Sequence, residues 1–224
     1  MNKFCKTIKY GRLYEYSNIL KVAVIDSGLS ESLQISLGNR VVGGFSYAVD
    51  RNAVERQIDF FDNCGHGTAC TSIISKLAPN TQFYIVKILD ESGKTNSNIL
   101  IKALNDLAKS DIDIINLSVS TGTVEHYAEL QKVCHELMLE GKIIISSKMN
   151  FGSNSSYPAI LDSVIGIEGG IFCNTGIIWF NKNRPIQCVA DSSPSIIRTG
   201  ENEYIIGKRN SKATAVVTGI VRFL

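Results

Sequence analysis

Long apolar runs, paired cysteines and an excess of one charge are all missing from this sequence. No segment reaches the about 20 consecutive apolar residues that a membrane-spanning helix needs. The formal net charge is only +2, so no overall field favours a nucleic acid or an anionic membrane as partner. Internal repeats, low-complexity tracts and domain linkers are also absent. The 224 residues therefore predict a single domain, spanning 1–224, with one core.

The cysteines form neither a CxxC pair nor a regular framework. Met1–Tyr10 has lysines but no apolar segment behind them, so we predict no signal peptide. Reduced thiols and a cytoplasmic location are then expected. A zinc site is the alternative, although the spacing of zinc ligands is missing. The six cysteines are Cys5, Cys64, Cys70, Cys134, Cys173 and Cys188.

Short β-branched segments alternate with segments of helical spacing. This alternation predicts an α/β fold of three layers, α/β/α, with a mostly parallel central sheet. Two polar stretches, Val49–Cys64 and Phe151–Tyr157, are predicted loops. The predicted strands are Lys21–Ile25, Val41–Phe45, Phe83–Ile88, Ile112–Leu117, Ile143–Ser147 and Val164–Ile167. The predicted helices are Thr68–Leu77, Asn98–Lys109, Val124–Leu139 and Ala213–Leu224.

Polar residues at the carboxyl ends of such strands are candidates for chemistry. Asp26 follows four apolar residues of the first strand, where an unpaired carboxylate is costly. A helix cap or turn former is the alternative role for Asp26. His66 stands between two glycines at a helix start, where the helix dipole disfavours an imidazolium unless a carboxylate faces it.

Ser211 opens the last apolar helix, either as an ordinary N-cap or as a nucleophile whose own N–H faces a developing oxyanion. The other histidines, His126 and His135, share one predicted helix and are expected to be surface or structural residues.

Together these segments resemble the signature blocks of subtilisin-like serine peptidases, from about Val22 to Leu224. The blocks occur in the family's order as Asp26-Ser27-Gly28, His66-Gly67-Thr68 and Asn210-Ser211-Lys212-Ala213-Thr214-Ala215. Ile114–Ser118 is similar to the family's substrate-binding strand. Ile143–Gly152, followed by Tyr157-Pro158-Ala159, is similar to its oxyanion segment.

The resemblance implies a role for each residue. Ser211 would attack the scissile carbonyl, His66 would carry the proton, and Asp26 would orient the imidazole. Asn150 would donate to the oxyanion together with the Ser211 backbone N–H; a turn residue in a polar loop is the alternative for Asn150. An extended peptide would add as a β-strand and pair with Ser118, Val119 and Ser120.

Some residues depart from the family pattern. Arg209 and Asn210 replace the usual Gly-Thr before the nucleophile, and Lys148 and Met149 replace small residues before Asn150. Ser120 replaces a usual glycine. These changes predict a narrowed cleft and a selective enzyme, with an inactive homologue that only binds peptide as the alternative.

The chain also looks reduced relative to the family. Asp26 lies too near the start to leave room for a folding pro-domain, and the segment after His66 runs into Leu77–Asn80 without a calcium-binding insertion. We therefore expect no metal and no other cofactor.

Two local features suggest regulation or selectivity. Lys148, Lys208, Arg209 and Lys212 fall in segments expected to border the cleft, where they would favour an acidic peptide; solvated loop lysines are the simpler interpretation. Cys64, two residues before His66, either lines the cleft or links activity to redox state.

The sequence thus predicts a cytoplasmic serine endopeptidase that cuts a particular peptide or precursor, such as a leader peptide. A peptide-binding pseudopeptidase is the alternative, and general protein turnover is a weaker one. The oligomeric state is not predicted.

Overall fold

The computed structural model describes residues 19–50, 53–122, 125–150, 155–172, 176–199, 202–206 and 209–221. Several residues that the sequence singles out lie outside these ranges, namely Cys5, Val124, Phe151, Gly152, Cys173 and Lys208.

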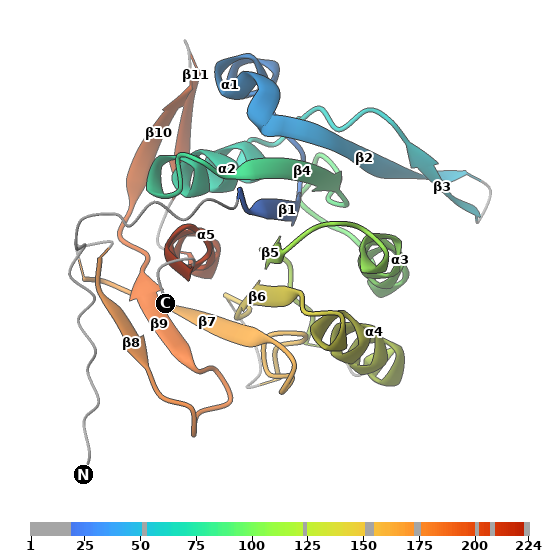
Figure 1. Ribbon diagram of the computed structural model, residues 1–224, viewed down its shortest axis with the longest axis vertical. Helices are drawn as coiled ribbons and strands as arrows, with labels where there is room; N and C mark the ends of the chain where they lie inside the picture. Colours follow the sequence, from blue (N-terminus) through green and yellow to red (C-terminus); the bar gives the residue numbers. More distant parts are fainter. Residues whose placement is uncertain are drawn as a thin grey trace.

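The core of the fold is a nine-stranded sheet in the order β3-β2-β4-β1-β5-β6-β7-β9-β8 (Figure 1). Only β3 and β8, at the two edges, run antiparallel to their neighbours. A separate hairpin, β10-β11, stands beside it. The strands are β1 Lys21–Asp26, β2 Val41–Asp50, β3 Ala53–Gln57, β4 Gln82–Lys87, β5 Ile114–Leu117, β6 Ile143–Ser147, β7 Ile165–Gly170, β8 Ile178–Phe180, β9 Cys188–Asp191, β10 Ser195–Thr199 and β11 Asn202–Ile206.

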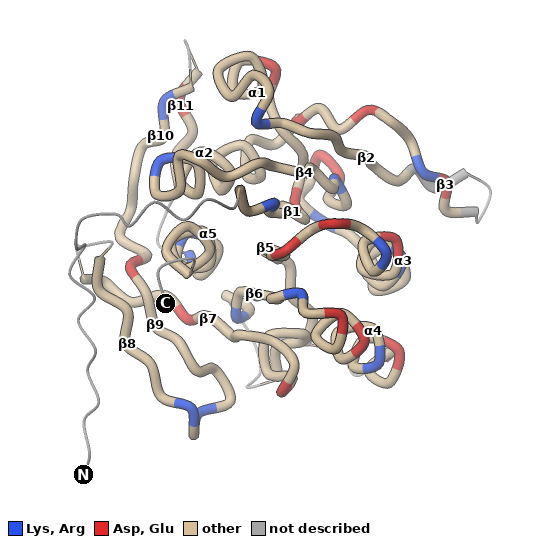
Figure 2. Tube along the Cα trace, viewed as in Figure 1, with Lys and Arg blue, Asp and Glu red and all other residues tan. Residues whose placement is uncertain are grey.

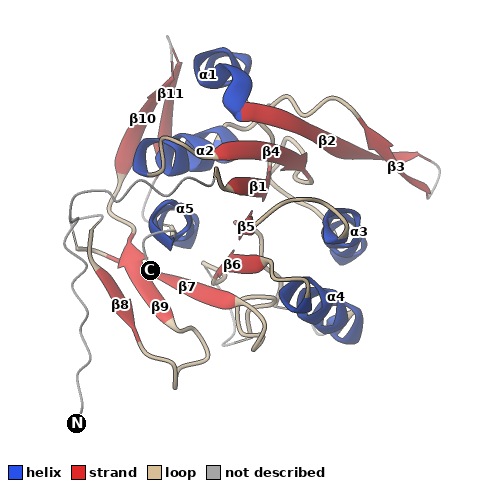
Figure 3. Ribbon diagram, in the orientation of Figure 1, coloured by secondary structure: helices blue, strands red, loops and turns tan. Residues whose placement is uncertain are grey.

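Helices cover both faces of the sheet, which confirms the predicted α/β fold (Figure 3). One apolar cluster joins α1, α2 and α5 to one face, and a second joins α3 and α4 to the other. Charges of both signs lie along α3 and α4, on the outside of the molecule (Figure 2). The helices are α1 Glu31–Leu37, α2 His66–Leu77, α3 Ser97–Ala108, α4 Tyr127–Leu139 and α5 Asn210–Ile220, with a short 3-10 turn at Gly38–Arg40.

Two of these helices, α2 and α5, run side by side and position the candidate site. A Cβ atom on Gly219 would lie 2.7 Å from Cβ of Leu77, so the carboxyl ends of the two helices touch. Burial from Ala213 to Ile220 of α5 is what the apolar sequence predicts, but the helix begins earlier, at Asn210, and also buries Ser211 and Lys212. The first turns of both helices then reach the sheet edge at which the parallel strands end.

One predicted loop is partly wrong. Within Val49–Cys64 the chain forms β3, which pairs with β2 from Ser46↔Gln57 to Asp50↔Ala53. The sequence gives no strand pattern because residues 55–57 are exposed at the sheet edge and bury no face. Arg56 helps to hold the strand, since its guanidinium lies 3.9 Å from the Phe45 ring centre.

Among the described residues, no helix combines the length and the apolar character needed to cross a membrane.

Candidate active site

Asp26 and His66 form the centre of the candidate site. Asp26 is the last residue of β1 and is fully buried, and His66 is the first residue of α2. His66 Nδ1 lies 2.7 Å from Asp26 Oδ1, and the Ser27 backbone N–H donates to the same oxygen at 2.8 Å. The buried Asp26 carboxylate is therefore paired with His66.

Two glycines bring the Asp26 and His66 segments into contact. A Cβ atom on Gly67 would lie 2.5 Å from the Gly28 carbonyl oxygen, and one on Gly28 would lie 2.4 Å from the Phe60 carbonyl oxygen. Gly28 also has a φ of 116°, a conformation that other residues rarely adopt. The Gly67 N–H donates to Ser27 Oγ at 2.8 Å. Only glycine at both positions permits this approach.

Asp62 fixes the start of α2, a role that the sequence reasoning missed. Its Oδ1 accepts from the backbone N–H groups of Cys64 (3.0 Å) and Gly65 (2.7 Å). Its Oδ2 accepts from the Thr68 N–H (2.9 Å) and hydroxyl (2.6 Å). The N-cap position itself holds Gly65, which has no side chain, so Asp62 satisfies these donors from outside the helix.

The charges around His66 favour its protonated form. The negative charge of Asp26 raises the pKa of His66 above its ordinary 6.5, burial opposes this, and the hydrogen bond to Asp26 and the charge of Asp62 add to the rise. The positive charge of Arg209 lowers the pKa of His66 and so acts in the opposite sense. Asp26 thus offsets the effect of the helix dipole on an imidazolium at the start of α2.

Ser211 lies in the first turn of α5, and the structure excludes the simple N-cap role. The N-cap residue is Arg209, and no side-chain hydrogen bond caps this helix. Ser211 is 4% exposed. Within the described residues no hydrogen bond joins Ser211 to His66. In enzymes without substrate, the hydrogen bonds between catalytic residues are often long or poorly aligned.

Asn150 is held by the residue that precedes Ser211. The Asn210 backbone N–H donates to Asn150 Oδ1 at 3.0 Å. Because Oδ1 already accepts this hydrogen bond, the two N–H donors on Nδ2 of Asn150 point away from the Asn210 N–H. Asn210 also donates from its side chain to the Lys148 carbonyl at 2.8 Å and accepts from the Gly169 N–H at 2.8 Å. One residue therefore links α5, β7 and the segment before Asn150.

The predicted peptide-binding segment follows β5. Ser118, Val119 and Ser120 are each partly exposed. In the described part of the chain, the backbone groups of Val119 and Ser120 form no hydrogen bond. Beside them lies a cavity of about 350 Å³, lined mostly by polar residues from the start of α3 and by Glu125 and His126.

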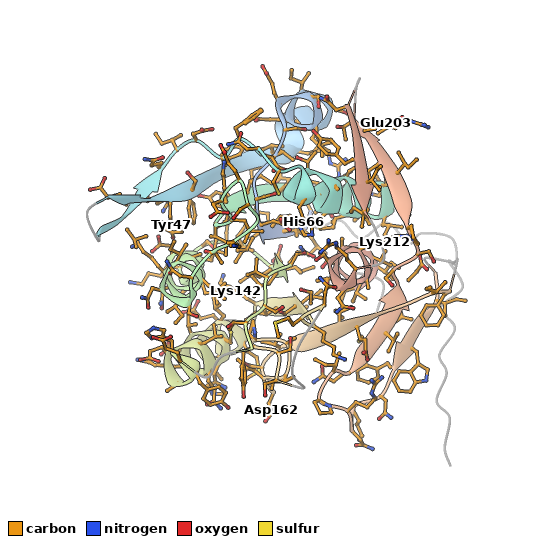
Figure 4. All side chains as sticks on the ribbon, turned by 180° about the vertical axis from the view of Figure 1, so that it is seen from behind. Tyr47, His66, Lys142, Asp162, Glu203 and Lys212 are labelled. Atoms are coloured by element: carbon orange, nitrogen blue, oxygen red, sulfur yellow. The ribbon has the colours of Figure 1, made fainter. Side chains whose placement is uncertain are left out.

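Lys148 and Lys212 are each paired with a carboxylate, which counts against their recruiting an acidic peptide, and burial also contradicts the alternative of a solvated loop lysine for Lys212. Lys148 pairs with Glu168 at 2.6 Å, and Lys212 is buried against Asp191 at 3.0 Å. These partners come from β7 and β9, distant in sequence from the lysines. Arg209 is exposed and has no carboxylate partner within the described residues. Figure 4 labels Lys212 at the start of α5 and His66 at the start of α2.

The described cysteines are free thiols in different settings. Cys64 is exposed and lines a hollow with Phe61 and Tyr204. Cys70 is buried, and its thiol, Asp26 and His66 offer donor atoms within 4.8 Å of one another. Burial raises the pKa of Cys70 well above its ordinary 9.0, so the thiol stays protonated and is a poor metal ligand.

Met149 is partly buried, and its backbone N–H donates to Ser156 Oγ at 2.7 Å. That its side chain narrows the cleft remains a prediction.

Known proteins provide an independent comparison. The Subtilase family matches residues 17–223. Subtilisin DY of Bacillus licheniformis is 28% identical over an alignment of 208 residues that covers 85% of this chain and 68% of that protein. The Intracellular serine protease of Paenibacillus polymyxa is 23% identical over 92% of this chain and 66% of its own length. The alignment with this chain covers only 23% of the Minor extracellular protease Epr of Bacillus subtilis and 51% of the Thermophilic serine proteinase of a Bacillus species.

Two solved structures share the fold. A cold adapted subtilisin-like serine proteinase aligns with a TM-score of 0.71 at 18% identity, over 96% of this chain and 79% of its own. A lanthipeptide protease aligns with a TM-score of 0.69 at 20% identity, over 89% and 71%. Both agree with the mostly parallel sheet described above.

Proposed function

Because the chain belongs to the subtilase family of serine peptidases, we propose that it is a serine endopeptidase with Ser211 as nucleophile, His66 as general base and Asp26 as the orienting carboxylate. The observation that carries the proposal is the 2.7 Å contact between His66 Nδ1 and buried Asp26. Donation from Nδ1–H to Asp26 leaves Nε2 to accept the Ser211 proton. The imidazolium that forms is stabilised by Asp26 and later protonates the leaving amine.

The oxyanion would be bound by two donors from neighbouring segments. Asn150 supplies a side-chain N–H, since its Oδ1 already accepts from Asn210 at 3.0 Å. The Ser211 backbone N–H supplies the second, because the first N–H groups of a helix have no partner inside it. Losing one such donor typically costs about 10²–10³ in turnover.

The substrate would be an extended peptide added as a strand beside Val119 and Ser120. Their backbone groups are free of other described partners, as this mode of binding requires. A substrate side chain would enter the polar cavity of about 350 Å³ beside them. Such a cavity favours a polar side chain over a large apolar one, since apolar groups leave its polar lining without partners.

We propose that the enzyme cuts a particular peptide or precursor. The support is the polar cavity together with Met149 and Arg209 around Ser211. A lanthipeptide protease shares the fold, so the same scaffold serves in an enzyme of that kind. The location proposed is the cytoplasm, supported by the free thiols of the four described cysteines and by a relative named an intracellular serine protease.

The second candidate is a protein that binds a peptide without cutting it. It is favoured by the absence of a hydrogen bond between Ser211 and His66 within the described residues and by Arg209 directly before the helix. In this case the peptide-binding segment would be retained and the nucleophile would be inert.

A fluorophosphonate probe separates the two candidates. The proposed enzyme is labelled, and labelling is lost in Ser211→Ala and strongly slowed in His66→Ala. Ser92→Ala is the matched control, because Ser92 is an exposed loop serine that bonds only to Asp90. In the active enzyme Ser211→Ala lowers turnover by at least about 10³. An intact protein that is not labelled, yet binds peptides, supports the second candidate.

A further inference from the structure

Directly after Ser211, the first turn of α5 contains a buried lysine. The side chains of Lys212 and Asp191 are 6% and 3% exposed, and Lys212 Nζ lies 3.0 Å from Asp191 Oδ2. Lys212 also donates to Ser195 Oγ at 2.7 Å and to the Ser193 carbonyl oxygen. All three ammonium protons therefore have acceptors, and all of them come from the end of β9 and the start of β10.

A contribution to folding stability does not by itself explain the buried ion pair of Lys212 and Asp191. A cation in the first turn of a helix opposes the helix dipole. A buried ion pair often contributes no more to stability than well-packed apolar residues of the same volume. A residue that breaks local rules next to a candidate nucleophile points to a functional role.

The neighbours on both sides of Ser211 are anchored to different strands. Asn210 bonds to Gly169 of β7 and to the Lys148 carbonyl, and Lys212 bonds to Asp191 of β9. The helix has no side-chain cap at Arg209 that would set its orientation instead. The two anchors therefore fix how the first turn is rotated about the helix axis.

We propose that Lys212 and Asp191 are positioning residues: their ion pair sets the rotation of the first turn of α5 and so aims Ser211 Oγ at His66 and the Ser211 N–H at the oxyanion. The inference rests on the proposed function of Ser211. The pair acts through Ser211 and does not touch the substrate.

The test removes both charges at once. Lys212→Met with Asp191→Asn leaves no unpaired charge, and the asparagine oxygen still accepts from the Phe172 and Ser193 N–H groups that now bond to Asp191. We expect a melting temperature close to that of the parent protein, an unchanged KM, and a kcat lowered about 10²-fold, the cost typical of a displacement of about 1 Å. A purely structural pair would not separate kcat from KM in this way.

A second measurement reports on the aim of Ser211 directly. A peptide aldehyde bonds covalently to the serine and forms the oxyanion, whereas the matching peptide alcohol only occupies the cleft. We expect the double variant to lose affinity for the aldehyde about 10²-fold and to keep its affinity for the alcohol. The control is Arg198→Met with Glu203→Gln, which removes a salt bridge on the exposed β10-β11 hairpin and should alter neither affinity.

Each outcome is decisive. If the parent protein is not labelled by a fluorophosphonate, the proposed function fails. If the parent is labelled and the double variant matches it in kcat and aldehyde affinity, the inference is overturned while the function stands. A double variant that no longer folds also overturns it, because the pair would then be holding the fold together.

Discussion

Replacing Asp62 tests whether one buried carboxylate holds His66 in place. Asp62→Ala leaves the N–H of Gly65 and both the N–H and the hydroxyl of Thr68 without their acceptor. Each buried group left unpaired costs about 1–3 kcal/mol, so we expect unfolding to become easier by about 3–5 kcal/mol. In a domain of this size the melting temperature should fall by roughly 6–20 °C.

The measurement is best made by calorimetry in a Ser211→Ala background, which removes self-digestion. Asp59→Ala is the matched control, since Asp59 lies in the same loop, is exposed and accepts only from the Phe61 N–H at 2.9 Å. We expect its melting temperature to change little. In the active background, Asp62→Ala should also lower kcat, because His66 begins the helix that Asp62 caps.

The pH dependence provides a second check. Burial raises the pKa of Asp62, but the hydrogen bonds from Thr68 and Gly65 outweigh burial and lower this pKa below its ordinary 3.8. The charged form therefore stabilises the fold above pH 3.8, and this contribution disappears as the pH falls through the folded-state pKa. The gap between the parent and Asp62→Asn should shrink in that range. A constant gap, or an Asp62→Ala protein as stable as Asp59→Ala, would refute this account of α2.

Three more outcomes are expected. Asp26→Asn should lower turnover by about 10⁴ and move the acidic limb of the pH–rate profile to lower pH, because the charge of Asp26 raises the pKa of His66; a limb that stays in place contradicts the pairing. Gly28→Ala should prevent folding, since its Cβ would lie 2.4 Å from a carbonyl oxygen, whereas Gly93→Ala, with nothing within 4 Å and only a φ of 73° to strain it, should cost about 1–2 kcal/mol. Among the described cysteines of the native protein, maleimide should label only Cys64, as mass spectrometry of the peptides would report.

Much of the sheet could be predicted from sequence because its strands are buried on both faces. β1 and β5 are nearly continuous β-branched runs, α3 has clear apolar spacing, and α5 is an apolar segment that is buried on all sides. The missed elements lack these signals. α1 has only seven residues and buries only Leu33 and Leu37, and the hairpin β10-β11 leaves Ile196 and Ile205 exposed, so neither gives a clear apolar pattern.

The site was predictable where its chemistry depends on short motifs. Asp26 and His66 stand in segments whose glycines reveal a close approach. The roles of Asp62 and Asp191 depend on partners that local patterns do not identify. A carboxylate six residues before Thr68 gives a weak signal, and nothing around Lys212 indicates that β9 supplies its counter-charge.

The position of α5 has a consequence for how the protein is made. Ser211 follows His66 by 145 residues (211 − 66), so a ribosome has finished β1, α2 and most of the sheet before it adds the proposed nucleophile. Until α5 is synthesised, the apolar faces of α2 and the neighbouring strands lack the helix that buries them. If Ser211 is the nucleophile, as proposed, the growing chain has no peptidase activity, while its uncovered apolar surface favours aggregation. Synthesis of α5 both supplies Ser211 and covers the apolar faces of α2 and the neighbouring strands.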